Sequence, residues 1–398
     1  MRRREFITLI GGATAWPLAA RAQQSTKMPA IGVLSPGRSE PPDSSLDMVN
    51  AFLQGLQGLG YIEGRIITVE RQFAQWQQAR LRELAADLVA RKVDVLVANS
   101  TTAALAAKEA TGTIPIVAIS MADPVADELV ASLARPGGNV TGTTFLGPEL
   151  VAKRLQLLRE VVPGLSRVAA LWHPKAYSER TMAGVVKEVE AAAQTLGLAL
   201  QLVPALSPDD FAGAFAAMTK DRAQALIVLP SPMLFGGYQR IVSMAAENRL
   251  PAIGAAREFA DFGGLLSYGV NLPQLARQTA PYVDKILKGA KPSELPVEQP
   301  TKFELVINVR TARELGLTVS REMLLIADDV IEWVRNRKLV RSSPCPWQAK
   351  LFLSSKFPAN GTSDQSIWLK NWRVRWSRQW AKNSVGGPCS TMTPRSVK

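Results

Sequence analysis

Histidine and cysteine are nearly absent from this 398-residue sequence, and both shortages limit its chemistry. His173 is the single histidine, and the two cysteines, Cys345 and Cys389, lie near the C-terminal end. No Cys, His and acidic residues have the spacing of a metal site, so we expect neither a metal nor a cofactor. A Ser-His-acid triad would have to use His173, and no G-x-S-x-G motif surrounds a serine. We therefore expect no catalytic residues and no enzymatic activity.

A hydrophobic run long enough to cross a membrane is also missing. The mildly apolar residues 8–20 fall short of the roughly 20 residues that a spanning helix needs. They follow three arginines at positions 2–4 and precede an A-x-A motif at 20–22, the order of a cleavable export signal. An arginine pair followed by x-Phe-Ile resembles a twin-arginine signal, with an amphipathic helix as the alternative. We expect residues 1–22 to direct export and the mature protein to be soluble and periplasmic.

Acidic residues are scarce only at the two ends, where the net charge of +13 is concentrated. Residues 333–398 hold thirteen Lys or Arg against one acid, Asp364, and six of the nine tryptophans. Residues 23–332 are close to neutral, which argues against nucleic acid as a partner. The tryptophans between 368 and 380 recur every fourth residue among arginines, as in a helix that binds a membrane surface or nucleic acid. We favour the alternative of a basic, Trp-rich extension that does not fold.

Short apolar runs alternate with longer helical patterns through the rest of the chain, and the alternation restarts near residue 147. Strands are expected at 30–35, 66–71, 93–98, 114–120, 168–172, 198–203, 225–229, 251–253, 264–268 and 303–307. Helices are expected at 46–59, 79–91, 102–110, 150–162, 180–196, 208–219, 236–248, 275–288 and 311–315. The glycine-rich residues 137–142 indicate a turn before a strand-like stretch.

This alternation predicts an α/β fold of two doubly wound parallel-sheet lobes. We expect residues 29–146 plus about 272–298 to form the first lobe, and 147–271 plus about 299–331 the second. Two or three crossing strands would join the lobes and allow hinge closure. Ligands of such sheets bind at the carboxyl ends of the strands, which places the expected site in the cleft between the lobes.

Polar or aromatic residues follow several of the expected strands and are the candidate ligand-binding residues. In the first lobe they are Ser35, Ser100, Thr101, Thr102, Ser120 and Asp123. In the second lobe they are Trp172, His173, Tyr177, Ser231, Arg257 and Tyr268. The N-terminus of the helix at 102–110 suits a carboxylate, and Asp123 could meet an ammonium group. Plain helix capping is the alternative for the serines and for Asp123, and an ion pair for Arg257.

Several longer runs resemble one known family. They are residues 123–125 (DPV), 133–142 (LARPGGNVTG), 245–251 (AAENRLP), 263–265 (GGL), 267–269 (SYG), 286–289 (ILKG) and 295–301 (LPVEQPT). In this order they are similar to ABC-transporter substrate-binding proteins of the tryptophan/tyrosine-uptake type, over about residues 29–331. The resemblance implies a type I periplasmic-binding fold, with a membrane permease and an ATPase as partners. It departs at His173, where the family has asparagine in Trp-Asn-Pro, and at Ser231, where an acid is common.

The resemblance implies that the chain is an extracytoplasmic receptor that delivers a small organic ligand to an ABC importer. The expected ligands are an amino acid, an aromatic acid or another small carboxylate, bound by a monomer. Two alternatives stay open on the residues alone. One is a receptor that presents its ligand-bound form to a membrane signalling partner, and the other is an exported hydrolase using carboxylate or Ser-Lys chemistry.

Overall fold

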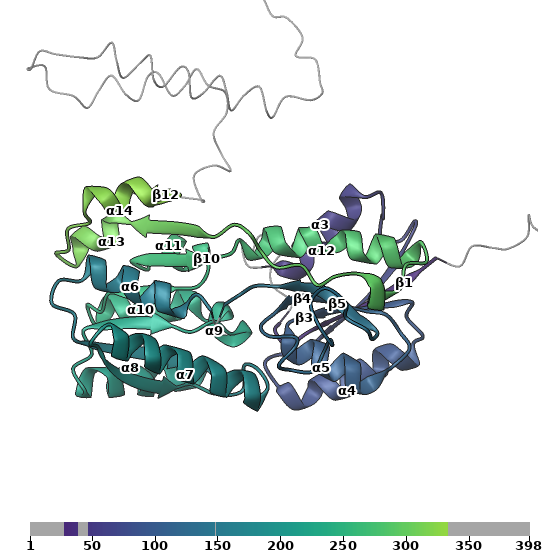
Figure 1. The fold of residues 1–398 in the computed structure, drawn as a ribbon, viewed down its shortest axis with the longest axis horizontal. Coiled ribbons are helices and arrows are strands. Elements are labelled where there is room, and N and C mark those ends of the chain that lie inside the picture. Colours follow the sequence, from purple (N-terminus) through teal and green to yellow (C-terminus); the bar gives the residue numbers. More distant parts are fainter. Residues whose placement is uncertain (1–27, 39–46, 148, 333–398) are drawn as a thin grey trace, which may run out of the picture. The chain divides into compact units, whose positions relative to one another are not determined.

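The fold is described by a computed structural model, which covers residues 28–38, 47–147 and 149–332. Within these residues the strands form two separate sheets, each with helices along its faces (Figure 1). The predicted export signal and the basic, Trp-rich tail both lie outside the described residues. No helix within the described ranges is long and apolar enough to cross a membrane.

The first sheet has five parallel strands in the order β2-β1-β3-β4-β5. They are β1 (Ala30–Ser35), β2 (Thr68–Phe73), β3 (Val95–Asn99), β4 (Ile116–Met121) and β5 (Val140–Thr144). Because β1 lies inside the sheet and the chain leaves it in both directions, the loops after β1 and β3 emerge side by side at the carboxyl edge. Open α/β sheets bind ligands at such a point.

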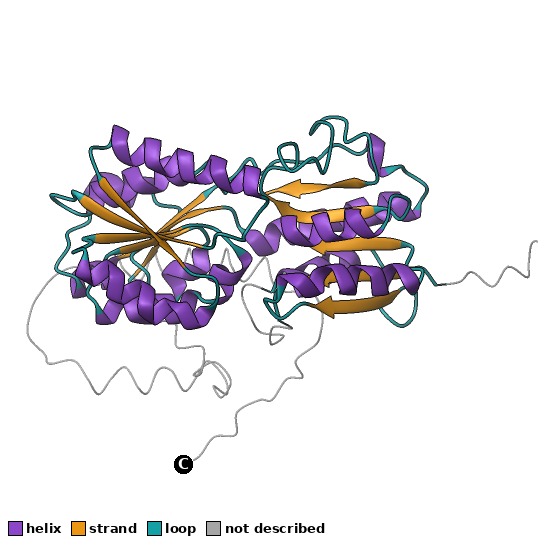
Figure 2. Cartoon of the chain, turned by 90° about the horizontal axis from the view of Figure 1, so that it is seen from below, coloured by secondary structure: helices purple, strands orange, loops and turns teal. Residues whose placement is uncertain are grey.

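Helices cover both faces of the first sheet because its strands are apolar on both sides. On one face lie α3 (Met48–Gly58) and α12 (Leu272–Leu287), packed against Ile31, Val33 and Val95. On the other lie α4 (Gln78–Ala90) and α5 (Thr101–Ala110), packed against Leu34 and Leu96. Helix α12 thus joins this sheet from a distant part of the sequence. Figure 2 shows strands between layers of helices.

The second sheet has seven strands in the order β12-β11-β10-β9-β8-β6-β7. They are β6 (Arg167–Trp172), β7 (Ala199–Pro204), β8 (Ala225–Val228), β9 (Ala252–Gly254), β10 (Leu266–Gly269), β11 (Glu304–Asn308) and β12 (Asp329–Ile331). All neighbours are parallel except β10 and β11, which pair antiparallel with Leu266 opposite Ile307. The chain returns from α12 before entering β11, and this return reverses the direction of the strand.

In the part of the chain that the structure describes, eight α-helices accompany the second sheet. They are α6 (Val151–Val161), α7 (Glu179–Thr195), α8 (Phe211–Lys220), α9 (Pro232–Gly236), α10 (Tyr238–Glu247), α11 (Arg257–Asp261), α13 (Val309–Glu314) and α14 (Arg321–Ile326). Their apolar side chains share one core with strands β6, β8, β9 and β10. Tyr238 is fully buried there between Phe235 and Phe259, whose ring centroids lie 5.4 and 4.9 Å from its own.

The chain passes between the two sheets three times: after β5, after β10 and before β11. Arg154, in the first turn of α6, connects the first two passages. Its Nε donates to the carbonyl oxygen of Tyr268 at 2.7 Å and its Nη1 to that of Gly147 at 2.8 Å. The side chain is 1% exposed, and burial lowers the pKa of the guanidinium to about 10. One buried residue therefore ties the first crossing segment to β10, the strand from which the second crossing starts.

Three details differ from the sequence predictions. Residues 137–142 were expected to form a turn, but from Val140 onward they belong to β5. The helix expected at 236–248 is α10, and it is preceded by a short helix that was not predicted, α9, which Ser231 caps and Pro232 begins. The short elements α11, α14 and β12 were not predicted.

Candidate functional site

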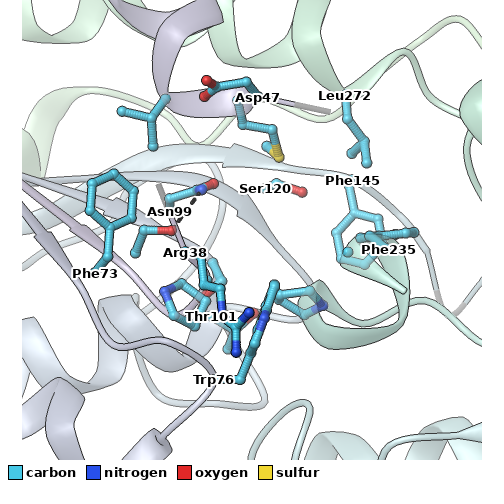
Figure 3. Close-up of a pocket in the computed structure, with 18 of the residues that line it drawn as sticks. Arg38, Asp47, Phe73, Trp76, Asn99, Thr101, Ser120, Phe145, Phe235 and Leu272 are labelled. Atoms are coloured by element: carbon cyan, nitrogen blue, oxygen red, sulfur yellow. Dashed lines mark hydrogen bonds between the residues drawn. The ribbon is translucent and has the colours of Figure 1, made fainter. Parts of the chain in front are cut away.

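A cavity of about 770 Å³, part of it open to solvent, lies at the carboxyl ends of β1, β3 and β4 (Figure 3). Residues from both sheets and their helices line it. They are Ser35, Pro36, Gly37, Arg38, Asp47, Met48, Val49, Phe73, Trp76, Asn99, Ser100, Thr101, Ser120, Phe145, Tyr177, Pro232, Phe235, Gly236 and Leu272.

Hydroxyl and amide groups line the side of the cavity formed by the first sheet. Ser35 ends β1, and its Oγ accepts a bond of 3.3 Å from Asn99 Nδ2 at the end of β3. Ser100 follows β3 and Ser120 lies within β4. Both have a positive φ, which is 141° at Ser100 and 63° at Ser120. Strain of this kind costs about 1–3 kcal/mol per residue and is concentrated at functional sites.

Helix α5 points its N-terminus at the cavity. Ser100 is its N-cap, and Ser100 Oγ accepts from the N–H of Ala103 at 3.2 Å. The N–H groups of Thr101 and Thr102 belong to the first turn, where no intrahelical partner exists. The Thr101 hydroxyl accepts from the Ala122 N–H at 2.9 Å and so ties β4 to this helix. The arrangement favours an anionic ligand group near Thr101.

Aromatic rings form much of the remaining wall. Phe73 comes from β2 and lies on the opposite side of the space from Phe145 and Phe235, and Trp76 comes from the loop after β2 (Figure 3). The rings of Phe145 and Tyr177 lie 6.5 Å apart, tilted by 40°. The Tyr177 hydroxyl donates to the carbonyl oxygen of Pro230 at 2.5 Å, so the polar end of this lining ring has a hydrogen-bond partner.

Among the described residues, one positive and one negative side chain line the same cavity, Arg38 and Asp47. Asp47 caps α3, accepting from the Asn50 N–H at 2.9 Å and from Asn50 Nδ2 at 2.6 Å. Burial is the largest influence on its carboxyl group and raises the pKa, although these hydrogen bonds oppose the rise. A zwitterionic ligand would find a counter-charge for each of its own groups here.

A second cavity of about 330 Å³ shares Pro36, Trp76 and Pro232 with the first. His173 and Thr102 are among its lining residues. Burial, with a smaller contribution from Lys175, lowers the pKa of His173 to about 4, so its imidazole is neutral at physiological pH. Nδ1 of His173 is buried without a hydrogen-bond partner.

The structure brings seven of the twelve candidate residues to these two cavities. Ser35, Ser100, Thr101, Ser120 and Tyr177 line the first. Thr102 and His173 line the second. The contribution of each to ligand binding stays a prediction, and the remaining five candidates do not line either cavity.

Those five have other contacts. Asp123 Oδ1 accepts from the N–H groups of the next turn at 3.2 and 2.9 Å, and Ser231 Oγ caps α9. Trp172 packs against the core of the second sheet. Arg257 pairs with Asp329 and Asp261, which is the ion-pair alternative considered from the sequence. The backbone carbonyl of Tyr268 accepts from Arg154, and its ring lies 6.2 Å from that of Phe303.

The sequence reasoning missed the charged and aromatic lining, namely Arg38, Asp47, Phe73, Trp76, Phe145 and Phe235. An aromatic residue in an α/β chain is usually part of the core, and no spacing marks these as neighbours. Trp76 alone carries a signal, because it follows an expected strand in a polar stretch. Within the described ranges no group of three or more His, Cys, Asp or Glu is placed to hold a metal.

The sequence of residues 41–331 matches the family described as "ABC transporter substrate binding protein". The chain belongs to this family. The match includes every strand of the two sheets except β1, and every residue that lines the two cavities except those before residue 41. A curated relative, a tyrosine-binding protein of Clostridioides difficile, is 25% identical over 310 residues, covering 75% of this chain and 84% of the relative.

Solved structures agree with the family assignment. A conserved domain protein from Vibrio cholerae has 30% identity and a TM-score of 0.70, covering 76% of this chain and all of that one. An ABC domain from Streptococcus pneumoniae in complex with L-Trp has 28% identity and a TM-score of 0.68, covering 76% of this chain and 99% of that one. The two-lobed α/β fold predicted from the sequence is confirmed.

Proposed function

We propose that this chain is the extracytoplasmic receptor of an ABC importer for an aromatic amino acid. The observation that carries the proposal is the lining of the larger cavity, where the described residues combine aromatic walls with one cation, one anion and a helix N-terminus. An amino acid with a ring needs all of these features, because its carboxylate, its ammonium group and its side chain are bound by different chemistry. A tyrosine-binding relative and a structural neighbour holding L-Trp support the same ligand class.

In this proposal the ligand carboxylate lies near the N-terminus of α5 and Arg38, and the ammonium group lies near Asp47. The ring occupies the space among Phe73, Trp76 and Phe145. Both sheets contribute to the lining, so a bound ligand would stabilise their approach. The proposal has three further parts. The receptor delivers its ligand to a membrane permease and its ATPase, the N-terminal signal directs its export, and it acts as a monomer.

Isothermal titration of the full chain tests the ligand class. The panel contains L-tryptophan, L-tyrosine, L-phenylalanine, L-leucine, L-glutamate and a hexose. We expect one-to-one binding of at least one aromatic amino acid, at least tenfold tighter than that of L-leucine, and no change in the ligand after incubation. Binding restricted to the hexose or to L-glutamate would refute the aromatic class, and a chemically altered ligand would refute the receptor function.

A further inference from the structure

Trp76 is the aromatic residue that lines both cavities. Pro36 and Pro232 line both as well, so these three residues form the wall that separates the two spaces. Pro36 lies in the loop after β1 and Pro232 begins α9 beside the second sheet, whereas the indole ring is a movable side chain. The position of this ring therefore decides whether the two cavities are separate or continuous.

The backbone of Trp76 is held in an unusual conformation. Gln75 and Trp76 have φ values of 53° and 66°, in the left-handed region that residues with a side chain seldom adopt. Two hydrogen bonds to the loop after β1 hold this turn. The Gln75 N–H donates to the Gly37 carbonyl at 2.8 Å and the Trp76 N–H to that of Pro36 at 2.7 Å. The strained backbone at Gln75 and Trp76 thus directs the indole ring of Trp76 toward the space between the sheets.

Two glycines leave room for the indole ring, one from each side. A Cβ atom at Gly37 would lie 3.1 Å from Cη2 of Trp76, and one at Gly236 would lie 2.7 Å from Cζ2. The second value is below any normal contact, so a side chain at position 236 would displace the ring. Gly236 ends α9, which belongs to the second sheet, so the ring reaches across from the first sheet to the second.

We propose that Trp76 sets the length of ligand that the receptor accepts, by closing the larger cavity on the side of the smaller one. This inference rests on the proposed function and specifies the site further. With the indole in place, a ligand with a single aromatic group fills the first cavity and contacts the ring. Without it, the space lined by Thr102 and His173 becomes continuous with the first, and a longer aromatic side chain fits.

The test compares two ligands in four proteins. Affinities for L-tryptophan and for the longer 4-phenyl-L-phenylalanine are measured by calorimetry in the wild type, Trp76→Ala, Trp76→Phe and Gln77→Ala. Trp76→Ala should change the ratio of the two affinities at least tenfold in favour of the longer ligand, and Trp76→Phe by less. The neighbouring Gln77→Ala, exposed in the same loop, should leave the ratio unchanged. An unchanged ratio in Trp76→Ala overturns the inference, even when L-tryptophan binds the wild type as proposed.

A second measurement does not depend on the ligand. Gly236→Ala is made in the wild type and in Trp76→Ala, and the melting temperatures of the ligand-free proteins are compared. Displacement of the ring should lower the wild-type melting temperature by about 2 °C or more, and this effect should vanish in the Trp76→Ala background. Equal effects in both backgrounds would show that the ring does not occupy the space beside Gly236, and would contradict the proposed wall. Failure of every amino acid to bind the wild type would instead refute the proposed function.

Discussion

Asp47 has two roles that one substitution separates. Its carboxylate caps α3 through Asn50, and it is the one acidic residue among those described around the larger cavity. Asparagine is as good an N-cap as aspartate, so Asp47→Asn removes the charge while keeping the cap.

We expect Asp47→Asn to weaken L-tryptophan binding roughly tenfold to a hundredfold, because a charged hydrogen bond to the ammonium group is lost. Binding of indole-3-propionate, which has no ammonium group, should change little in the same variant. Titration calorimetry with both compounds measures the difference, and an equal loss for both would show that Asp47 does not face the ammonium group. The unfolding midpoint in urea serves as the control for the retained cap.

Glu258 is a buried acid that the proposed site does not use. It is 6% exposed in the first turn of α11, and burial raises the pKa of its carboxyl group to about 7. The pKa in the unfolded chain is near the ordinary 4.5. Below pH 4.5 the group is protonated in both states and its contribution to stability is complete. As the pH rises through 7, the folded state has to ionise a buried group and that contribution is lost.

The expected loss between pH 4.5 and pH 8 is about 3 kcal/mol of unfolding free energy. In Glu258→Gln this dependence should be absent. The stability difference between variant and wild type, measured by urea unfolding at pH 5 and pH 8, should therefore shift by about that amount in favour of the variant. The matched control is Glu83→Gln, an exposed glutamate of α4. A difference that is the same at both pH values would contradict the buried-acid interpretation.

At the scale of elements, β5 shows why the glycine-rich stretch was misinterpreted. Gly142 lies inside the strand with a φ of 138°, and a Cβ there would be 1.9 Å from the carbonyl oxygen of Ala118 on β4. This glycine allows two strands to approach closely at an irregular point of the ladder, where the register shifts between Ala118 and Met121. In a sequence, such a glycine is indistinguishable from one in a turn.

We expect Gly142→Ala to cost more than about 4 kcal/mol of unfolding free energy, because backbone atoms of β4 have to move. Gly138→Ala is the control, since a Cβ at that position meets nothing within 4 Å. Soluble yield and the urea midpoint of the two variants provide the comparison. Similar midpoints would mean that the strands separate easily and that the close approach is not required.

Most other elements could be predicted from the spacing of their hydrophobic residues and from the residues that cap their helices. Strands β1, β3, β4, β6 and β8 are apolar on both faces and lie within two residues of their predicted bounds. Helix α11 was missed because it has five residues and its N-cap, Ala256, makes no side-chain capping bond. The antiparallel position of β11 could not be predicted, since strand direction depends on the path of the chain and not on local pattern.

At the scale of the whole folded region, a polar contact joins the turn after β4 to the N-terminus of α7. Asp127 Oδ1 accepts from the hydroxyls of Ser178 and Thr181, the latter at 2.6 Å. Its Oδ2 is buried without a partner, and burial raises the pKa of the carboxyl group despite these bonds. Nearby Asp123 raises it further and Arg180 lowers it. The ionised carboxylate thus makes this contact between the two sheets less favourable at neutral pH than at low pH.

We expect Asp127→Asn to shift the ligand-free protein toward its closed form at pH 7, because the amide keeps an acceptor for both hydroxyls and carries no charge to desolvate. Small-angle scattering should show a smaller radius of gyration than in the wild type. The difference should disappear below the ordinary pKa of 3.8, where the wild-type carboxyl is protonated in both forms.

Glu128→Gln is the control, because its exposed ion pair with Arg180 contributes at most about 1 kcal/mol. A larger radius in Asp127→Asn would mean that the charge strengthens the contact.

The site as a whole was only partly predictable. Ser35, Ser100 and Thr101 follow strands of one sheet, and the rule that parallel strands end at one edge brings them together. Phe145 and Phe235 reach the cavity only through the packing of two sheets, which no local pattern encodes.

The position of α12 has a consequence for the order in which the chain is made. The apolar face of the first sheet that holds Ile31 and Val33 is covered in part by Ala276, Ala280 and Val283. A ribosome has therefore to synthesise well over a hundred further residues after β5 before that face can close. Until then α3 covers only part of that face, and release of a shorter chain would leave the rest of its apolar surface open to aggregation.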